Sequence, residues 1–503
     1  MPLSPPRIFL SLAALALAAC ATVTPVDSSA TQQRLDVAMR LIAERNLNEG
    51  EPALRAVIEE KAFGGLPADA RYGALLAAAK AAAARRDLTL EYQYLIRVNA
   101  MPQAGYQEGL AQLQAGVRLH EQPDASVVRD WTWFLGRWPE QISRFDQRNI
   151  YMVIRASKKL NNESTLPLLQ ALYGAHWKLK WDFEPSSTWR GLATLLMDKK
   201  LTVEAVEVSK HITDPDDFIV MRADRRFDAL IAANPAQYDV EAAANRQLRA
   251  LEFAVQNAPT SLELRRIEID ALRRRQHYGA MLAAADSIVS QVQSTNYPEK
   301  LFEDYAENYI WILNDRAEAL TRIGRWDDGV AQLEAASSGT EHGAANVSQR
   351  LNLGNLYCEL GRPQDAMAAL SKVGAGVSPY GNMQIQAVRV DAGTQLGDLK
   401  QVADSLRFLS ANRLEAPFTY QYALIVAAQP DRAAQYLITR LLDSNTRQDA
   451  LQSVQGYMPT PTTPLGEERD ARWHKIMARK DVQAAIAKVG RIEMNRFEEP
   501  DLP

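Results

Sequence analysis

Apolar residues recur at the spacing of one helix face along almost the whole chain, and this periodicity constrains the fold more than any other feature. Near the start, the face consists of Leu35, Ala38, Met39 and Ile42, at positions i, i+3, i+4 and i+7. Short polar stretches separate successive segments of this kind, as they do in antiparallel helical hairpins. No alternating, strand-like run is joined to another by an Asn-Gly or Asp-Gly turn. We therefore predict an almost entirely α-helical chain.

The clearest internal repeat lies between Arg350 and Val373. Small residues that let two helices approach closely, an aromatic residue that fills the space between hairpins and a turn glycine occur there at fixed positions: Leu353, Gly354, Tyr357, Gly361, Ala366 and Leu370. This spacing resembles the tetratricopeptide repeat (TPR). The resemblance implies an all-α, right-handed superhelical solenoid of antiparallel helical hairpins, with Gly361 ending a first helix in the left-handed conformation.

Related units flank this repeat. Gly324 upstream and Gly397 downstream occupy the turn position, at spacings close to the family period of about 34 residues. A fourth unit, 259–287, has Glu268 and Arg275 where the pattern expects a small residue and the turn glycine. We assign residues 259–415 to TPR-like repeats.

The remaining sequence keeps helical hairpins without the TPR signature. Residues 34–258 form a divergent helical region, and its middle, 131–190, holds six of the nine tryptophans. Residues 416–503 are expected to form further helical repeats and capping helices, which cover the apolar end of a solenoid.

The N-terminus has the organisation of an export signal. Residues 8–19 form an apolar run that is too short to span a membrane and has the length of a signal-peptide core. The run ends in Leu17-Ala18-Ala19-Cys20, which resembles the bacterial lipobox. The resemblance implies a signal peptide over 1–19, lipidation of Cys20, a flexible tether over 20–33 and anchoring to the periplasmic face of the outer membrane. Ordinary secretory cleavage after Ala21 is the alternative.

No catalytic or cofactor motif is visible. The six histidines form no H-E-x-x-H pattern, and the chain has no G-x-S-x-G elbow or P-loop. The formal net charge of −4 gives no reason to expect nucleic acid, and Cys358 is interpreted as a packing residue. Asp214, Asp216 and Asp217 lack the further ligands of a calcium loop and predict a turn that terminates a helix. We expect no metal, no cofactor and no enzymatic activity.

The TPR resemblance also implies a binding surface. In that family, the first helices of successive hairpins line a concave groove that binds peptides or partner proteins. The matching positions in this chain are Asn314, Glu318, Arg322, Asn355, Glu359, Asp391 and Gln395. Polar residues at these positions are equally compatible with a solvated helix face.

Two functional hypotheses follow. The first is a non-enzymatic periplasmic scaffold or adaptor lipoprotein that binds protein or peptide partners in envelope assembly. The alternative is a cell-wall-active protein that binds or cleaves peptidoglycan or another glycan, using the tryptophans of 131–190 and an acid such as Glu140 or Asp182.

Overall fold

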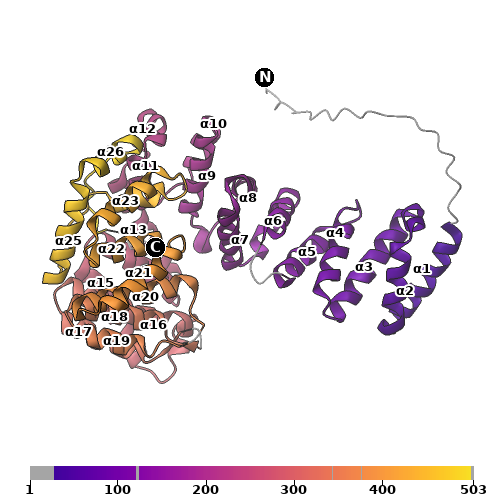
Figure 1. Ribbon diagram of the computed structural model, residues 1–503. Helices are drawn as coiled ribbons and strands as arrows, with labels where there is room; N and C mark the ends of the chain where they lie inside the picture. The colour runs from indigo at the N-terminus through magenta and orange to yellow at the C-terminus, as the bar shows by residue number, and fades with distance from the viewer. Residues whose placement is uncertain (1–27, 120–123, 342–343, 375, 500–503) are drawn as a thin grey trace. The chain divides into compact units, whose positions relative to one another are not determined.

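The protein is all-α in the computed structural model, which describes residues 28–119, 124–341, 344–374 and 376–499 (Figure 1). The signal peptide, Cys20 and most of the expected tether lie outside these residues. The chain divides into two compact units, residues 1–176 and 177–503, and each is described by itself.

Unit 1 consists of helices that pack against their neighbours in chain order. They are α1 (Ser28–Ala43), α2 (Leu47–Glu59), α3 (Ala68–Ala84), α4 (Leu88–Asn99), α5 (Tyr106–Leu119), α6 (Ala125–Arg137), α7 (Gln147–Leu160) and α8 (Asn162–Gly174), with 3₁₀ turns at Lys61–Gly65 and Pro139–Arg144. The first helix begins before Arg34, within the expected tether. Thr31 is buried there, and its hydroxyl donates to the Glu60 carboxylate at 3.0 Å, which holds the start of α1 against the end of α2.

Unit 2 continues the same architecture. Its helices are α9 (Ser186–Asp198), α10 (Thr202–Ser209), α11 (Pro215–Ala223), α12 (Asp228–Ala233), α13 (Val240–Asn257), α14 (Leu262–Arg274), α15 (Tyr278–Gln293), α16 (Tyr305–Arg322), α17 (Trp326–Ser337), α18 (Ser348–Glu359), α19 (Pro363–Leu370), α20 (Pro379–Leu396), α21 (Leu399–Ala411), α22 (Pro417–Val426), α23 (Pro430–Leu442), α24 (Arg447–Ser453), α25 (Pro464–Met477) and α26 (Lys480–Val489). Short 3₁₀ turns lie at Lys180–Asp182, Arg225–Phe227 and Pro298–Lys300, and β1 (Thr340–Glu341) pairs antiparallel with β2 (Ala344–Ala345).

One type of turn joins the helices of many hairpins in both units. Its central residue is left-handed, and the following residue donates its backbone N–H to the carbonyl five positions earlier at 2.8–3.0 Å, as in a Schellman motif. The left-handed residues are Arg45, Arg86, Lys200, Gln276, Gly324, Gly361, Gly397 and Ala428. The turn glycines expected from the sequence are in this set. In the fourth unit, however, the left-handed residue is Gln276 rather than Arg275.

The TPR-like positions of the best repeat lie in the core. Leu353, Tyr357 and Ala366 are buried in one apolar cluster, and the Tyr357 hydroxyl donates to the Glu334 carboxylate of α17. A Cβ on Gly354 would lie 3.3 Å from the Val388 side chain, so α18 and α20 pack closely at this point. Stacked antiparallel hairpins therefore make up the TPR-like fold.

The acidic residues around Pro215 begin a helix rather than ending one, contrary to the sequence prediction. Asp214 is the N-cap of α11, and its side chain accepts the backbone N–H of Asp216 at 2.8 Å. Pro215 stands at the first position of α11, where a missing N–H costs no helical hydrogen bond.

The beginning and the end of unit 2 are in contact with each other. Helix α11 packs against α24, and the Arg491 backbone N–H donates to the Ala223 carbonyl at 2.9 Å. Residues 490–499, which we call the tail segment, then run in an extended conformation beside residues 456–458, with backbone hydrogen bonds of 2.8–3.0 Å between them. Phe497 of the tail segment is buried. The tail segment and α24 thus connect the last part of unit 2 to its early helix α11.

Candidate partner-binding groove

Two adjoining cavities in unit 2 form a groove along the first helices of successive hairpins. The first cavity, of about 430 Å³, is lined by α14, α16, α18 and Leu333 of α17. The second, of about 450 Å³, is lined by α16, α18, α20, α22, α25, the tail segment and Thr460 of the loop before α25. Asn355 and Glu359 of α18 line both cavities. They therefore mark the junction of the groove.

The structure brings most of the predicted groove residues together. Asn314 and Glu318 line the first cavity, Arg322 and Asp391 line the second, and Asn355 and Glu359 line both. Gln395 is the exception, because it lines neither cavity. Its amide donates to the Cys358 carbonyl and to the Asp391 carboxylate, each at 2.8 Å, and so ties α20 to α18.

Several of these side chains are already engaged within the protein. The Asn314 amide oxygen accepts a hydrogen bond from Asn352 at 2.7 Å. The Arg322 guanidinium lies 2.7 Å from the Glu498 carboxylate and 3.2 Å from that of Glu318. Engaged groups of this kind hold the walls of the groove in place and have less capacity left for a ligand.

Asn355 and Glu359 differ from these residues. They lie one helical turn apart on α18, and within the described chain neither side chain makes a hydrogen bond or an ion pair. Burial raises the pKa of Glu359, while the positive charges of Arg469 and Arg322 oppose that shift. An unpaired amide and an unpaired carboxyl at the junction of two cavities are free to contact a ligand.

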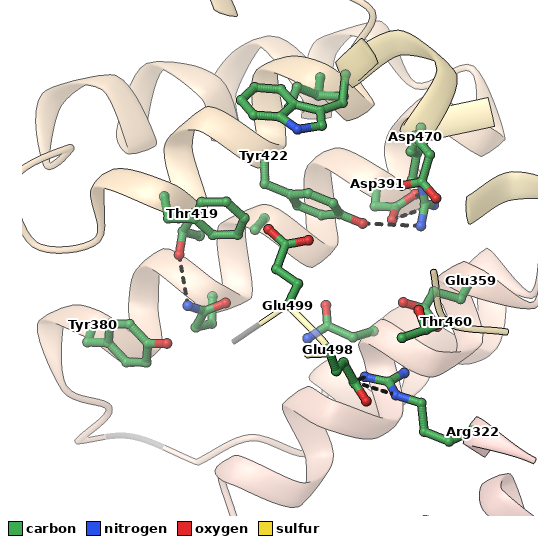
Figure 2. A pocket seen from close by; sticks show the side chains of 17 residues that line it. Arg322, Glu359, Tyr380, Asp391, Thr419, Tyr422, Thr460, Asp470, Glu498 and Glu499 are labelled. Atoms are coloured by element: carbon green, nitrogen blue, oxygen red, sulfur yellow. Dashed lines mark hydrogen bonds and ion pairs between the residues drawn. The ribbon is translucent and has the colours of Figure 1, made fainter. Parts of the chain in front are cut away.

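The second cavity contains a buried ion pair in contact with the hydroxyl of one of its aromatic side chains, Tyr422 (Figure 2). Arg469 of α25 donates to the Asp391 carboxylate at 2.7 Å and to the Tyr422 hydroxyl at 3.2 Å. Burial raises the pKa of Asp391, and the guanidinium partly offsets the shift. The aromatic side chains of the lining are Tyr380, Phe418, Tyr422 and Trp473.

The first cavity has a similar combination of charge and aromatic surface. The Arg266 guanidinium lies 4.8 Å from the centre of the Trp311 ring and 3.4 Å from the Asp315 carboxylate. Burial raises the pKa of Asp315 to about 6. Arg266 is thus held by a ring and a carboxylate that both belong to the protein itself.

The tail segment enters the groove through Glu498. This carboxylate is almost completely buried and accepts from Arg322 at 2.8 Å, from Arg273 at 3.2 Å and from the Tyr278 hydroxyl at 2.8 Å. The Glu498 backbone N–H donates to the Arg274 carbonyl at 2.9 Å. An extended segment of the chain itself therefore contacts α14 and α16 at the edge of the second cavity.

The groove also contains residues that the repeat pattern does not identify. Arg469 and Trp473 belong to α25, and Glu498 belongs to the tail segment. These parts of the chain lie far from α16–α20 in sequence and have no repeat signature. No local signal could have placed them in the groove.

The tryptophans of 131–190 pack among other side chains. Trp131, Trp177 and Trp189 are buried, and Trp133, Trp138 and Trp181 are half-buried. Within unit 1, Trp133 and Trp138 meet edge to face with ring centres 5.3 Å apart, and within unit 2, Trp177 and Trp189 do so at 6.2 Å. Glu140 and Asp182 are exposed. Neither cavity of the groove includes any of these residues.

Cys358 is a buried thiol against the Val388 carbonyl, and burial raises its pKa. Across the described ranges, histidines, cysteines and acids form no cluster suited to a metal ion. In the same ranges, no helix has the length and apolar character needed to span a membrane.

No protein-family model and no curated protein matches this sequence. Among solved structures, the chain is similar to a Rap protein complexed with competence and sporulation factor, with 11% identity, coverage of 92% of this chain and 99% of that chain, and a TM-score of 0.31. Yeast Tom70 aligns with 10% identity, coverage of 92% and 100%, and a TM-score of 0.30. Cut9 in the APC/C hetero-tetramer Cut9–Hcn1 aligns with 11% identity, coverage of 91% and 89%, and a TM-score of 0.26. The fold assignment rests on the hairpins and their turns.

Proposed function

We propose that the protein is a non-enzymatic scaffold that binds protein or peptide partners through the groove of unit 2. The observation that carries this proposal is the pair Asn355 and Glu359, which stand unpaired at the junction of the two cavities in the described chain. An amide side chain can donate to and accept from the backbone of an extended peptide at the same time. The neighbouring polar residues are held by internal contacts and shape the site.

We further propose that the scaffold acts in the bacterial envelope. The lipobox-like sequence ending in Cys20 supports lipidation, anchoring at the periplasmic face of the outer membrane and partners in envelope assembly. A Cys20→Ser variant tests this part by fractionation. Lipidation predicts that the parent protein sediments with outer membranes and that the variant does not, whereas an equal distribution of the two would refute it.

Photocrosslinking in living cells tests the scaffold proposal. A photoreactive residue at Asn355 is expected to capture a specific envelope protein, identified by mass spectrometry. The matched control carries the same residue at Leu399 on α21, an exposed position that lines neither cavity. Capture of the same proteins from both positions, or of none from Asn355, would contradict a partner-binding groove.

A further inference from the structure

The groove is acidic, although the chain as a whole is close to neutral with a net charge of −4. The basic residues in its lining are Arg266, Arg322 and Arg469. The acidic residues in its lining are Asp270, Asp315, Glu318, Glu359, Asp391, Asp470, Glu498 and Glu499. Buried Arg273, which lines neither cavity, forms ion pairs with Asp270, Glu318 and Glu498, and the acidic excess that remains indicates a ligand of opposite charge.

Internal ion pairs neutralise all three arginines of the lining. Arg266 pairs with Asp315 at 3.4 Å, Arg322 with Glu498 at 2.7 Å, and Arg469 with Asp391 at 2.7 Å. A guanidinium with such a partner has little attraction left for an anionic ligand. The groove therefore offers no spare positive charge among these residues.

Two carboxyl groups of the second cavity form no direct ion pair, although the charge of Arg469 acts on both of them. Glu359 of α18 and Asp470 of α25 make no hydrogen bond or ion pair through their carboxylates within the described residues. Figure 2 shows both lining the same cavity; Glu359 is half-buried and Asp470 is exposed, and partial desolvation raises the pKa of each. The charge of Asp470 contributes to the shift at Glu359.

Aromatic rings complete the cavity. Tyr380, Phe418, Tyr422 and Trp473 stand in the same lining; Figure 2 shows Tyr380 on the opposite side of the view from Glu359, and Tyr422 with its hydroxyl toward Asp391. The negative face of an aromatic ring attracts an ammonium or guanidinium group, and the ring also packs against the aliphatic part of a lysine or arginine. A volume of about 450 Å³ accommodates such a side chain.

We propose that the groove selects a basic, extended segment of its protein partner and takes a lysine or arginine side chain into the second cavity, between Glu359 and the aromatic rings. This inference rests on the proposed scaffold function and adds the chemistry of the partner. Asn355, one turn before Glu359, contacts the backbone of the segment. The exposed Glu499 of the tail segment, at the edge of the cavity, adds to the negative field.

Peptide binding to the full-length protein, purified in detergent, tests this selectivity by fluorescence polarisation. The probes are short labelled peptides in which serine alternates with lysine, glutamine or glutamate. The lysine peptide is expected to bind more tightly than the glutamine peptide, and the glutamate peptide is expected not to bind. Higher salt should weaken the lysine complex, because screening reduces the attraction between charges.

Variants at Glu359 distinguish binding in the second cavity from nonspecific electrostatic attraction of a basic peptide to an acidic protein. Glu359→Gln is expected to weaken binding of the lysine peptide about tenfold and Glu359→Lys to abolish it, with unchanged circular dichroism and Tm. The matched control, Glu467→Gln, removes an exposed carboxylate of α25 that does not line the cavity and should leave affinity unchanged.

Three outcomes would overturn the proposal: equal affinity for lysine and glutamate peptides, no effect of Glu359→Gln, or competition by spermidine as effective as that of the peptide. These outcomes are distinct from failure of the scaffold function. A partner captured from Asn355 whose crosslinked segment lacks lysine and arginine would refute the basic specificity alone. An Asn355 probe that captures nothing refutes the scaffold function.

Discussion

The Glu498 carboxylate lies 2.7 Å from the Arg322 guanidinium, although 176 residues separate them in the sequence. Arg273 contacts the same carboxylate and is itself buried. Removing the negative charge takes one counter-ion from the buried Arg273 and the half-buried Arg322, which keep contacts with Asp270 and Glu318. Such a loss is far more costly than the loss of an exposed ion pair.

We expect Glu498→Gln to lower the free energy of unfolding by about 3 kcal/mol, because the variant keeps the shape of the side chain and loses its charge. Urea unfolding of the full-length protein measures the change. Glu499→Gln is the control, since Glu499 is exposed, and its effect should stay within about 0.5 kcal/mol. Equal stability of the two variants would mean that the ion pair does not hold the tail segment.

Gly490 is expected to be intolerant of any side chain. A Cβ at this position would lie 2.2 Å from the Ala223 carbonyl oxygen and 2.6 Å from the Leu451 side chain. Gly490→Ala should therefore cost about 1–3 kcal/mol through forced displacement of α26 and the tail segment. Thermal unfolding measures the cost. Gly279→Ala, where a Cβ meets no atom within 4 Å, should leave the protein as stable or slightly more stable.

Arg440 of α23 is buried, and its three guanidinium nitrogens have no hydrogen-bond partner in the described chain. Burial lowers its pKa. Replacing an uncompensated buried charge with an apolar side chain of similar length removes the desolvation penalty. Arg440→Met should stabilise the protein by about 1–3 kcal/mol in urea unfolding. Arg432→Met, at an exposed position of the same helix, should be close to neutral, and a destabilised Arg440→Met would show that the guanidinium contributes to the fold.

Asp214 is expected to make stability depend on pH. Burial and the neighbouring charges of Asp216 and Asp217 raise its pKa from 3.8 to about 8, although Arg274 opposes the shift. The folded state therefore binds a proton more tightly than the unfolded state between these two values. Ionisation of Asp214 therefore lowers the free energy of unfolding as the pH rises from about 4 to about 8.

Asp214→Asn imitates the protonated carboxyl group and can still cap α11. We expect the variant to exceed the parent protein in unfolding free energy at pH 9, and this excess to shrink by at least about 1 kcal/mol as the pH falls to 5. Urea unfolding at pH 5, 7 and 9 gives the comparison. Parallel pH profiles for the two proteins would show that Asp214 is ionised throughout.

The hairpin turns show how far local sequence can predict this fold. Gly324, Gly361 and Gly397 identify three turns, because glycine adopts the left-handed conformation without a steric penalty. The same turn is formed around Arg45, Arg86, Lys200, Gln276 and Ala428. These residues have no preference for that conformation, so packing of the two helices and the backbone hydrogen bond impose it. The repeat is therefore more extensive in the backbone than in the sequence.

The side-chain contacts of the groove could also be predicted only in part from local sequence. Helix periodicity could predict that Asn355 and Glu359 share a face of α18, because residues four apart lie one above the other. It could not predict that Arg469 reaches Asp391, or that Gln395 turns away from the cavities to bond the Cys358 carbonyl. These contacts depend on the path of the chain after the repeats.

Closure by the tail segment has a consequence for how unit 2 unfolds. In an open array of repeats, each hairpin touches only its neighbours, so the ends can fray and the array can unzip one repeat at a time. Here α11 contacts α24, and Glu498 contacts α14 and α16. The outermost hairpins are thereby linked to each other, and neither end can come loose without breaking contacts at the other. Unit 2 should unfold in a single cooperative step, and its folding should be slower than that of a purely local helical array.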